Sequence, residues 1–498
     1  MGFLQYKEES PLIFTSAEFW IFFFIFLIFF SLSYKRKELK NTIILIFSLF
    51  FYYKSSGWAV LLLLHTINQD YWIARWIGYS KSLVKKKFLI WLSVVSNLLV
   101  LAYFKYAFLF VDFLNSILNS HIPKLNWIVA IIPNHDLLNI DADHILLPVG
   151  ISFFIFHTLS YTIDVYRGIV TPLKNWIDYA VFVSFFPELV AGPIVRARDF
   201  VEQLVAPYSV NRAMFGKGLC LILGGLFKKI VLSDVISTGI VDRVFDQPEL
   251  ASGPEAWMAM YGYGIQIFCD FSGYTDIAIG LALTLGYNLK PNFDQPYKSL
   301  TITEFWRRWH ISLSVWLRDY IYIPLGGNRH GNVRTYLNLI VTMLLGGLWH
   351  GASYKFILWG GLHGGALAIH KLWNSVSSMS KIHIPGWISW FITIHFAFFC
   401  WIPFRADSWK TALQIFQKLW ISWDVTSLPD IYLQFQLVIG LILLGFVLHF
   451  MPQRFKTGFS SLFETAPIWV LLVVTFLSLT VIYQFKTAES KPFIYFQF

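Results

Sequence analysis

The feature that most limits the fold of this chain is a series of apolar runs, most of them near 20 residues long, that recur along its whole length. About 20 apolar residues in a helix cross the hydrocarbon core of a bilayer. Only 14% of the 498 residues are charged and 56% are hydrophobic, whereas a soluble domain has roughly a quarter of its residues charged. We therefore expect an all-α, polytopic membrane protein with roughly 10–12 transmembrane helices.

The polar interruptions are too short for a separate soluble domain, so we expect one integral-membrane domain over 1–498. Within it, we expect N-terminal helices in 1–145, a core in 146–404 and C-terminal helices in 405–498. The expected spans lie near 18–32, 41–54, 57–78, 88–118, 146–165, 177–194, 213–240, 256–286, 335–349, 353–373, 386–404, 432–450 and 467–485.

The basic residues indicate which ends of these helices face the cytoplasm. Lys35–Lys37 follow the first span, and Lys85–Lys87 follow a two-helix hairpin that returns to the same side. The positive-inside rule therefore places both clusters in the cytoplasm and the N-terminus outside. An acidic segment with Asp136, Asp141 and Asp143 then fits the outer side. The net charge of +10 is gathered between apolar runs. It therefore indicates contact with anionic lipid headgroups rather than with nucleic acid.

The segment 287–334 is the exception to the apolar pattern. It is rich in Trp, Arg and Tyr and contains Pro291, Pro296 and Pro324, so it is too polar to cross lipid alone. Irregular backbone at membrane depth is tolerated only where protein or a water-filled cavity covers it. We expect 300–323 to form a re-entrant or interfacial helix pair that lines a cavity on the cytoplasmic side.

A polar stripe is predicted inside that pair. Arg307, His310, Ser314 and Arg318 are spaced by three and four residues, so on one helix they would share a face. The stripe could clamp phosphates through its arginines and move protons through its imidazole. The alternative is an interfacial amphipathic helix whose arginines meet lipid phosphates.

His350 stands at the end of an apolar, glycine-rich stretch. An ionisable ring at membrane depth indicates a functional site by default. The alternative is a structural histidine whose ring is hydrogen-bonded to a backbone carbonyl. Glycines four residues apart predict close helix packing. These pairs are Gly347 with Gly351, Gly360 with Gly364, and Gly361 with Gly365. A metal site with His363 and His370 is disfavoured, because two helical turns separate those rings, so we predict no metal.

Two carboxylates, Asp270 and Asp276, lie in another apolar stretch, where we expect each to pair with a nearby arginine as a structural brace. Cys220, Cys269 and Cys400 have no CxxC spacing, so neither a disulfide framework nor a zinc site is indicated. The chain has no GxSxG elbow, P-loop or GxGxxG fingerprint, which removes support for serine-hydrolase, nucleotide-hydrolysing and dinucleotide-binding functions.

Several motifs in order give the chain a resemblance to a known family. They are Pro148–Phe154, Asp164–Gly168, Phe186–Pro187 with Val190–Arg196, Gly273–Ala278, Phe305–Ser314, Trp316–Tyr320, Pro324–Arg329, Trp349–Ala352 and Phe493–Phe498. Over nearly its whole length the chain resembles the membrane-bound O-acyltransferase family, in its bacterial alginate O-acetyltransferase-like branch. The resemblance implies that the transmembrane helices surround a central catalytic tunnel. By residue match, His350 is similar to the signature active-site histidine of the family and His310 to its second active-site position.

The resemblance implies transfer of an acyl group, most often acetyl, from a cytoplasmic thioester such as acetyl-CoA to a hydroxyl acceptor reached from the other face. It also implies a bacterial inner membrane, an extracytoplasmic esterase-like partner protein and a polysaccharide acceptor such as alginate. With His350 as general base, the reaction needs no bound cofactor. Four arginines are candidates for the donor's phosphates: Arg307, Arg308, Arg318 and Arg329.

Other functions stay open on the sequence. A D-alanyl or lipid acyltransferase of the same fold would use another donor. A polysaccharide exporter, or a scaffold for an acetylation complex, would carry no chemistry and would tolerate replacement of His350.

Overall fold

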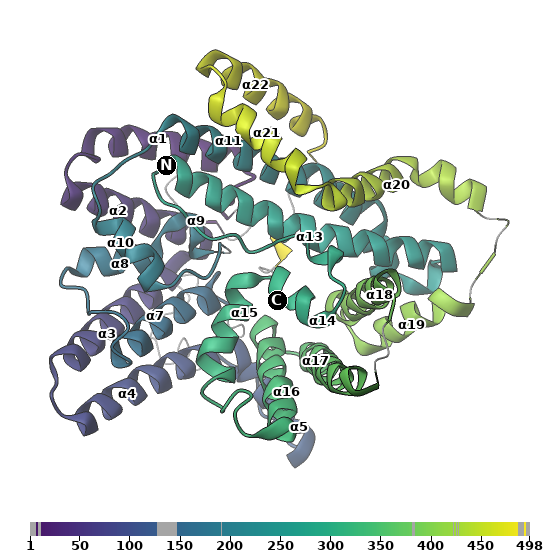
Figure 1. Ribbon diagram of the computed structural model, residues 1–498, viewed down its shortest axis with the longest axis horizontal. Helices are drawn as coiled ribbons and strands as arrows, with labels where there is room; N and C mark the ends of the chain where they lie inside the picture. The colour runs from purple at the N-terminus through teal and green to yellow at the C-terminus, as the bar shows by residue number, and fades with distance from the viewer. Residues whose placement is uncertain are drawn as a thin grey trace.

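The computed structural model describes residues 6–7, 11–126, 147–190, 192–380, 384–421, 423–424, 426, 428–486 and 493–494. All regular structure in these ranges is helical, which confirms the all-α prediction (Figure 1). The predicted acidic segment with Asp136, Asp141 and Asp143 lies outside the described residues, as do the motif residues Ala191 and Tyr495–Phe498.

The N-terminal helices follow the apolar runs closely. The break predicted at Ser55–Gly57 is confirmed, because Gly57 has φ 58°, a left-handed conformation that glycine adopts readily. The last of these helices continues through a π-helical stretch, η2, without interruption. The elements are α1 (Ala17–Ser33), α2 (Lys37–Ser56), η1 (Gly57–Ala59), α3 (Val60–Tyr79), α4 (Leu83–Leu101), η2 (Ala102–Tyr106) and α5 (Ala107–Leu118).

The span predicted at 177–194 is wrong. The chain forms α8, leaves helical geometry at Phe185 (ψ 109°) and resumes as the short α9 with Pro187 in its first turn. Proline cannot continue a helix from its N-terminal side and favours a first turn. A helix, α7, forms within the predicted span 146–165, and its crossing of the membrane stays a prediction. The elements here are α7 (Ile151–Tyr166), α8 (Trp176–Ser184), α9 (Phe186–Leu189) and α10 (Ala197–Val205).

The centre of the fold is a pair of helical segments at the predicted spans 213–240 and 256–286. The second, α13, crosses the middle of the molecule between the N-terminal and C-terminal helices (Figure 1). The pair packs backbone to backbone, since a Cβ at Gly225 would lie 2.5 Å from the carbonyl oxygen of Gly273. The elements are α11 (Arg212–Leu226), η4 (Phe227–Asp234), η5 (Ser237–Val241), α12 (Asp242–Asp246), η6 (Pro248–Leu250) and α13 (Gly253–Thr284).

Two ion pairs brace this central pair: that of Lys229 is buried and that of Lys228 is half-buried. Lys229 lies 2.6 Å from Asp270, and Lys228 lies 2.5 Å from Asp276. The bracing role predicted for the two aspartates is consistent with these contacts, but the predicted partner type is wrong. Both partners are lysines from η4, which the sequence places 41 and 48 residues away.

The remaining elements include the predicted helix pair of 300–323. It consists of α14 and α15, each of seven residues, about 10 Å long and too short to cross a bilayer. The elements are η7 (Pro296–Lys298), α14 (Ile302–Arg308), α15 (Ile311–Leu317), η8 (Arg318–Tyr322), α16 (Gly331–His350), α17 (Tyr354–Ser380), α18 (Gly386–Arg405), α19 (Trp409–Ile421), α20 (Leu428–Phe450), α21 (Gln453–Thr465) and α22 (Ile468–Gln484).

Within the described ranges, four segments are long and apolar enough to cross a membrane: Lys37–Tyr79, Leu83–Leu118, Gly386–Arg405 and Leu428–Phe450. Two shorter apolar helices, α1 and α22, accompany them. The chain is therefore a multi-pass membrane protein. The larger number of spans expected from the sequence stays a prediction.

The antiparallel pair α16 and α17 carries the glycines predicted for close packing. A Cβ at Gly360 would lie 2.3 Å from the carbonyl oxygen of Met343, and one at Gly364 would lie 2.9 Å from Cα of Ile340. The pair Gly361 and Gly365 does not pack in this way: Gly365 has open space around it. Both glycine pairs have the same spacing, but only one lies on the side of α17 that faces α16.

Candidate active site

His350 is the last residue of α16, where the chain turns away at Gly351. Its ring is 3% exposed and is held edge-on by aromatic rings, with Trp359 at 4.9 Å, Trp349 at 5.0 Å and Phe404 at 5.3 Å between centroids. Rings on several sides fix the plane of the imidazole.

His310 does not lie within a helix. It is the residue that joins α14 to α15, with φ 43°, in the left-handed region that non-glycine residues rarely occupy. Asn292 holds this turn, because its carbonyl accepts from the Ile311 N–H at 2.9 Å and its side chain from the Ser312 N–H at 3.2 Å. The buried imidazole packs on Phe271 at 4.6 Å and lies 5.7 Å from the ring of Trp349.

The prediction of one helical stripe is therefore wrong, because the helix breaks at Trp309–His310. Three of its four members nevertheless meet: Arg307, Ser314 and Arg318 line one cavity of about 600 Å³, and His310 is not among the residues that line it. The cavity predicted beside this helix pair is thus present. Its other walls include His370, Lys371 and Asn374 of α17.

This cavity, which we call the arginine cavity, has a positive excess. Arg307, Arg318 and Lys371 line it against one carboxylate, Glu304. Arg318 donates to Asp319 at 2.6 Å. Burial opposes the charge of Asp319, but hydrogen bonds from Arg318 and Arg196 hold the pKa of this carboxyl below its ordinary value. Asp319 thus stays ionised and fixes the Arg318 head group at the rim.

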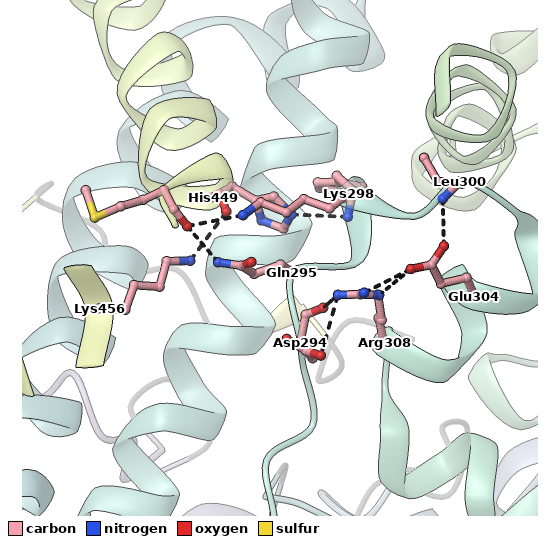
Figure 2. A network of polar contacts seen from close by, with 10 residues as sticks. Asp294, Gln295, Lys298, Leu300, Glu304, Arg308, His449 and Lys456 are labelled. Atoms are coloured by element: carbon pink, nitrogen blue, oxygen red, sulfur yellow. Dashed lines mark hydrogen bonds and ion pairs between the residues drawn. The ribbon is translucent and has the colours of Figure 1, made fainter. Parts of the chain in front are cut away.

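The other two predicted phosphate ligands lie elsewhere. Arg308 does not line the arginine cavity. It pairs with Glu304 at 2.9 Å and with Asp294 at 3.5 Å, as Figure 2 shows. The same figure shows Lys298 and Gln295 donating to the Met451 carbonyl at the end of α20. Arg329 is exposed in the turn before α16. Of the four predicted phosphate ligands, the structure therefore brings Arg307 and Arg318 together in the arginine cavity, but not Arg308 or Arg329.

A second, smaller cavity of about 40 Å³ touches His350 directly, and we call it the histidine pocket. Lys105, Trp349 and the stretch Leu147–Phe153 line it. This stretch runs into the first turn of α7 and follows the segment that the charge pattern places outside. His350 lies seven positions beyond Met343 of the arginine cavity, about 10 Å along α16.

Aromatic and histidine side chains separate the two cavities. Trp306 of the arginine cavity packs on Trp359 at 5.6 Å, and Trp359 packs on His350. His363 accepts a hydrogen bond from the Trp306 indole at 3.3 Å, whereas His370 bonds Thr303 at 2.8 Å. In the described part of the chain, no group of three or more His, Cys, Asp or Glu side chains is arranged to hold a metal ion.

Sequence reasoning missed Lys105 and Trp359. Lys105 carries a usable signal, since it is the one lysine or arginine between residues 88 and 118. Trp359 carries none, because 21 tryptophans are spread along the chain.

A buried imidazole in the wall of a small pocket, about 10 Å along α16 from a basic cavity, fits transfer of a group between two reactants. Comparison with known proteins defines the class. The sequence profile of the membrane-bound O-acyltransferase family matches residues 3–406. The chain therefore belongs to this family and is an O-acyltransferase.

Individual relatives are similar over most of their length. The chain is 40% identical to the probable alginate O-acetylase AlgI of Pseudomonas aeruginosa over 87% of this chain and 81% of that one. It is 35% identical to the probable alginate O-acetylase AlgI of Pseudomonas putida over 96% and 99%. It is also 35% identical to the peptidoglycan O-acetyltransferase of Helicobacter pylori over 75% and 72%.

Proposed function

We propose that this protein takes an acetyl group from acetyl-CoA at the cytoplasmic face and passes it across the membrane to a hydroxyl acceptor, for O-acetylation of an envelope or extracellular polysaccharide. The observation that carries the proposal is the position of His350, which lies in the wall of the histidine pocket and about 10 Å along α16 from the arginine cavity. The names of the relatives in Pseudomonas and Helicobacter support acetyl as the group transferred.

The arginine cavity suits the donor. Its volume of about 600 Å³ is within the range of small-molecule sites. Arg307 and Arg318 supply charge-assisted hydrogen bonds that match phosphate oxygens. Arg308 is paired with two carboxylates, and Arg329 does not line the cavity, so we assign neither of them to the donor.

In the reaction, the acceptor oxygen attacks the thioester carbonyl carbon while His350 takes the hydroxyl proton as general base. The C–S bond then breaks, the acetyl ester forms, and the proton passes to the departing thiolate. His310 polarises the carbonyl or holds the acceptor. Its ring and that of His350 both face Trp349, which keeps the two imidazoles in one cluster. The aromatic packing excludes water that would hydrolyse the thioester.

The histidine pocket is much smaller than the arginine cavity. We therefore propose that it admits only the reacting hydroxyl, and that an extracytoplasmic esterase-like partner protein completes transfer to the polymer. Alginate is the acceptor named for the Pseudomonas relatives and peptidoglycan for the Helicobacter relative. The bacterial inner membrane, with its anionic lipids, is the proposed location.

Sealed vesicles test this proposal. Acetyl-labelled acetyl-CoA is supplied at the cytoplasmic face only, and base-labile label is measured on the opposite face, with D-alanyl carrier protein as the competing donor. Label that crosses with wild type and not with His350→Gln supports the proposal. Consumption of the D-alanyl donor alone would establish the alternative acyltransferase. Equal transfer by both proteins would exclude His350 as the base.

A further inference from the structure

Lys105 lies in a part of the chain where a cation is costly. The segment Leu83–Leu118 is one of the candidate membrane spans and is largely exposed on the outside of the fold. Its outer residues include Leu98, Leu99, Phe110 and Phe113. An ionisable side chain at such a depth faces the protein interior and indicates a functional role.

The local backbone directs Lys105 inward. The stretch Ala102–Tyr106 is π-helical, a rare conformation that occurs frequently at functional sites. Within it, Lys105 and the next residue both reach the same partner. Lys105 Nζ donates to the Trp349 carbonyl, and the Tyr106 hydroxyl donates to the Leu348 carbonyl at 2.6 Å.

These two carbonyls belong to the last turn of α16, which ends at His350. The last carbonyls of a helix have no partner in the next turn, and the dipole at that end favours a cation. Lys105 and Tyr106 therefore fix the final turn from 244 and 242 residues away. The carbonyl held by Lys105 is that of the residue directly before His350.

Lys105 also lines the histidine pocket together with His350, Gly150 and Ser152. Its ammonium lies 5.9 Å from the centre of the Trp349 ring, which in turn packs on both His350 and His310. One side chain thus contacts the backbone and the ring that hold both imidazoles.

Resting on the proposed acetyl transfer, we infer that Lys105 is a positioning residue for His350: it holds the end of α16, with Tyr106, so that the imidazole meets the reacting hydroxyl in the histidine pocket. The inference assigns to the α4–α5 helix a part in the reaction. Its effect passes through His350 and not through donor binding, since Lys105 is absent from the arginine cavity.

The test compares Lys105→Met, Lys105→Arg and a matched control in purified protein, with acetyl-CoA as the varied substrate. The control is Lys355→Met, because Lys355 also donates to a backbone carbonyl, that of Ala406 at 2.8 Å, and lies outside the histidine pocket. We expect kcat of Lys105→Met to fall on the order of 10- to 100-fold, because small displacements of a catalytic group have effects of that size. KM for acetyl-CoA stays within about twofold, and Lys105→Arg restores part of kcat.

A purely structural role would instead lower the amount of folded protein and leave kcat per folded molecule unchanged, which would overturn the inference. An equal fall of kcat in Lys355→Met would overturn it too. If Lys105→Met is not recovered folded, Tyr106→Phe decides, because it removes one hydrogen bond to the same turn; wild-type kcat in this variant would refute the inference. If the wild type itself consumes no acetyl-CoA, that result refutes the proposed function on which this inference rests.

Discussion

Gly360 offers a quantitative test of the link between the α16–α17 contact and His350. A Cβ there would lie 2.3 Å from the carbonyl oxygen of Met343 and 3.1 Å from Cα of Leu344. Real Cβ contacts do not fall below 3.0 Å, so Gly360→Ala must separate the two backbones by at least about 0.7 Å. Backbone atoms cannot move aside as the end of a side chain can, so α16 itself must shift.

The shift occurs seven residues before His350, along one helix that ends at the histidine. We expect Gly360→Ala to lose stability by about 1–3 kcal/mol from overpacking. We also expect kcat to fall on the order of 10- to 100-fold, the effect of displacing a catalytic group by less than 1 Å.

The assay measures acetyl-CoA consumption and the thermal midpoint of purified protein at matched concentration. Gly361→Ala is the control, because the nearest atom to its Cβ would be a side-chain carbon of Leu344 at 3.6 Å, an ordinary contact. In a helix this change is neutral or stabilising by up to about 1 kcal/mol. Wild-type kcat in Gly360→Ala, or an equal loss in Gly361→Ala, would refute the reasoning.

Three further predictions follow from the same structure. Arg307→Ala and Arg318→Ala should each raise KM for acetyl-CoA by about tenfold or more and leave kcat nearly unchanged, because each removes a charge-assisted hydrogen bond that binds the donor before the reaction. The control variant, Arg329→Ala, should leave steady-state kinetics unaltered. Asp270→Asn should lower stability by about 3 kcal/mol in thermal unfolding, because it leaves a buried lysine with one carboxylate fewer; an unchanged midpoint would contradict the bracing role. Burial and neighbouring lysines lower the pKa of Lys456 from 10.5 to about 8. The unfolded chain therefore binds more protons between these values, stability should rise with pH across that window, and Lys456→Met should reduce the slope.

The sequence predicts the helices well because lipid imposes one requirement, a long apolar run, that each segment meets by itself. It also identifies His350 as an unusual residue at membrane depth and places Arg307 in a polar stripe beside a predicted cavity. The break at His310 was missed because it depends on Asn292, which lies outside the helix pair and accepts both hydrogen bonds at the turn. The spacing of residues within the helix pair does not indicate a contact with a residue outside it.

The arginines show the same limit. Arg307 and Arg308 are adjacent and chemically identical, yet one lines the arginine cavity while the other pairs with Glu304 and Asp294. Only the rotation of α14 against its neighbours separates them. Lys105 and Trp349, which are 244 residues apart, meet through tertiary packing that local patterns do not encode.

The central claim is that His350 acts as the base in acetyl transfer, and the most direct measurement is transfer from radiolabelled acetyl-CoA by wild type, His350→Gln and His449→Gln at matched expression. His449 is the control because it is a buried histidine that accepts a hydrogen bond from the Tyr297 N–H at 3.1 Å, away from both cavities. We predict that His350→Gln loses at least about a hundredfold in rate while His449→Gln retains activity. Equal transfer by wild type and His350→Gln would contradict the account.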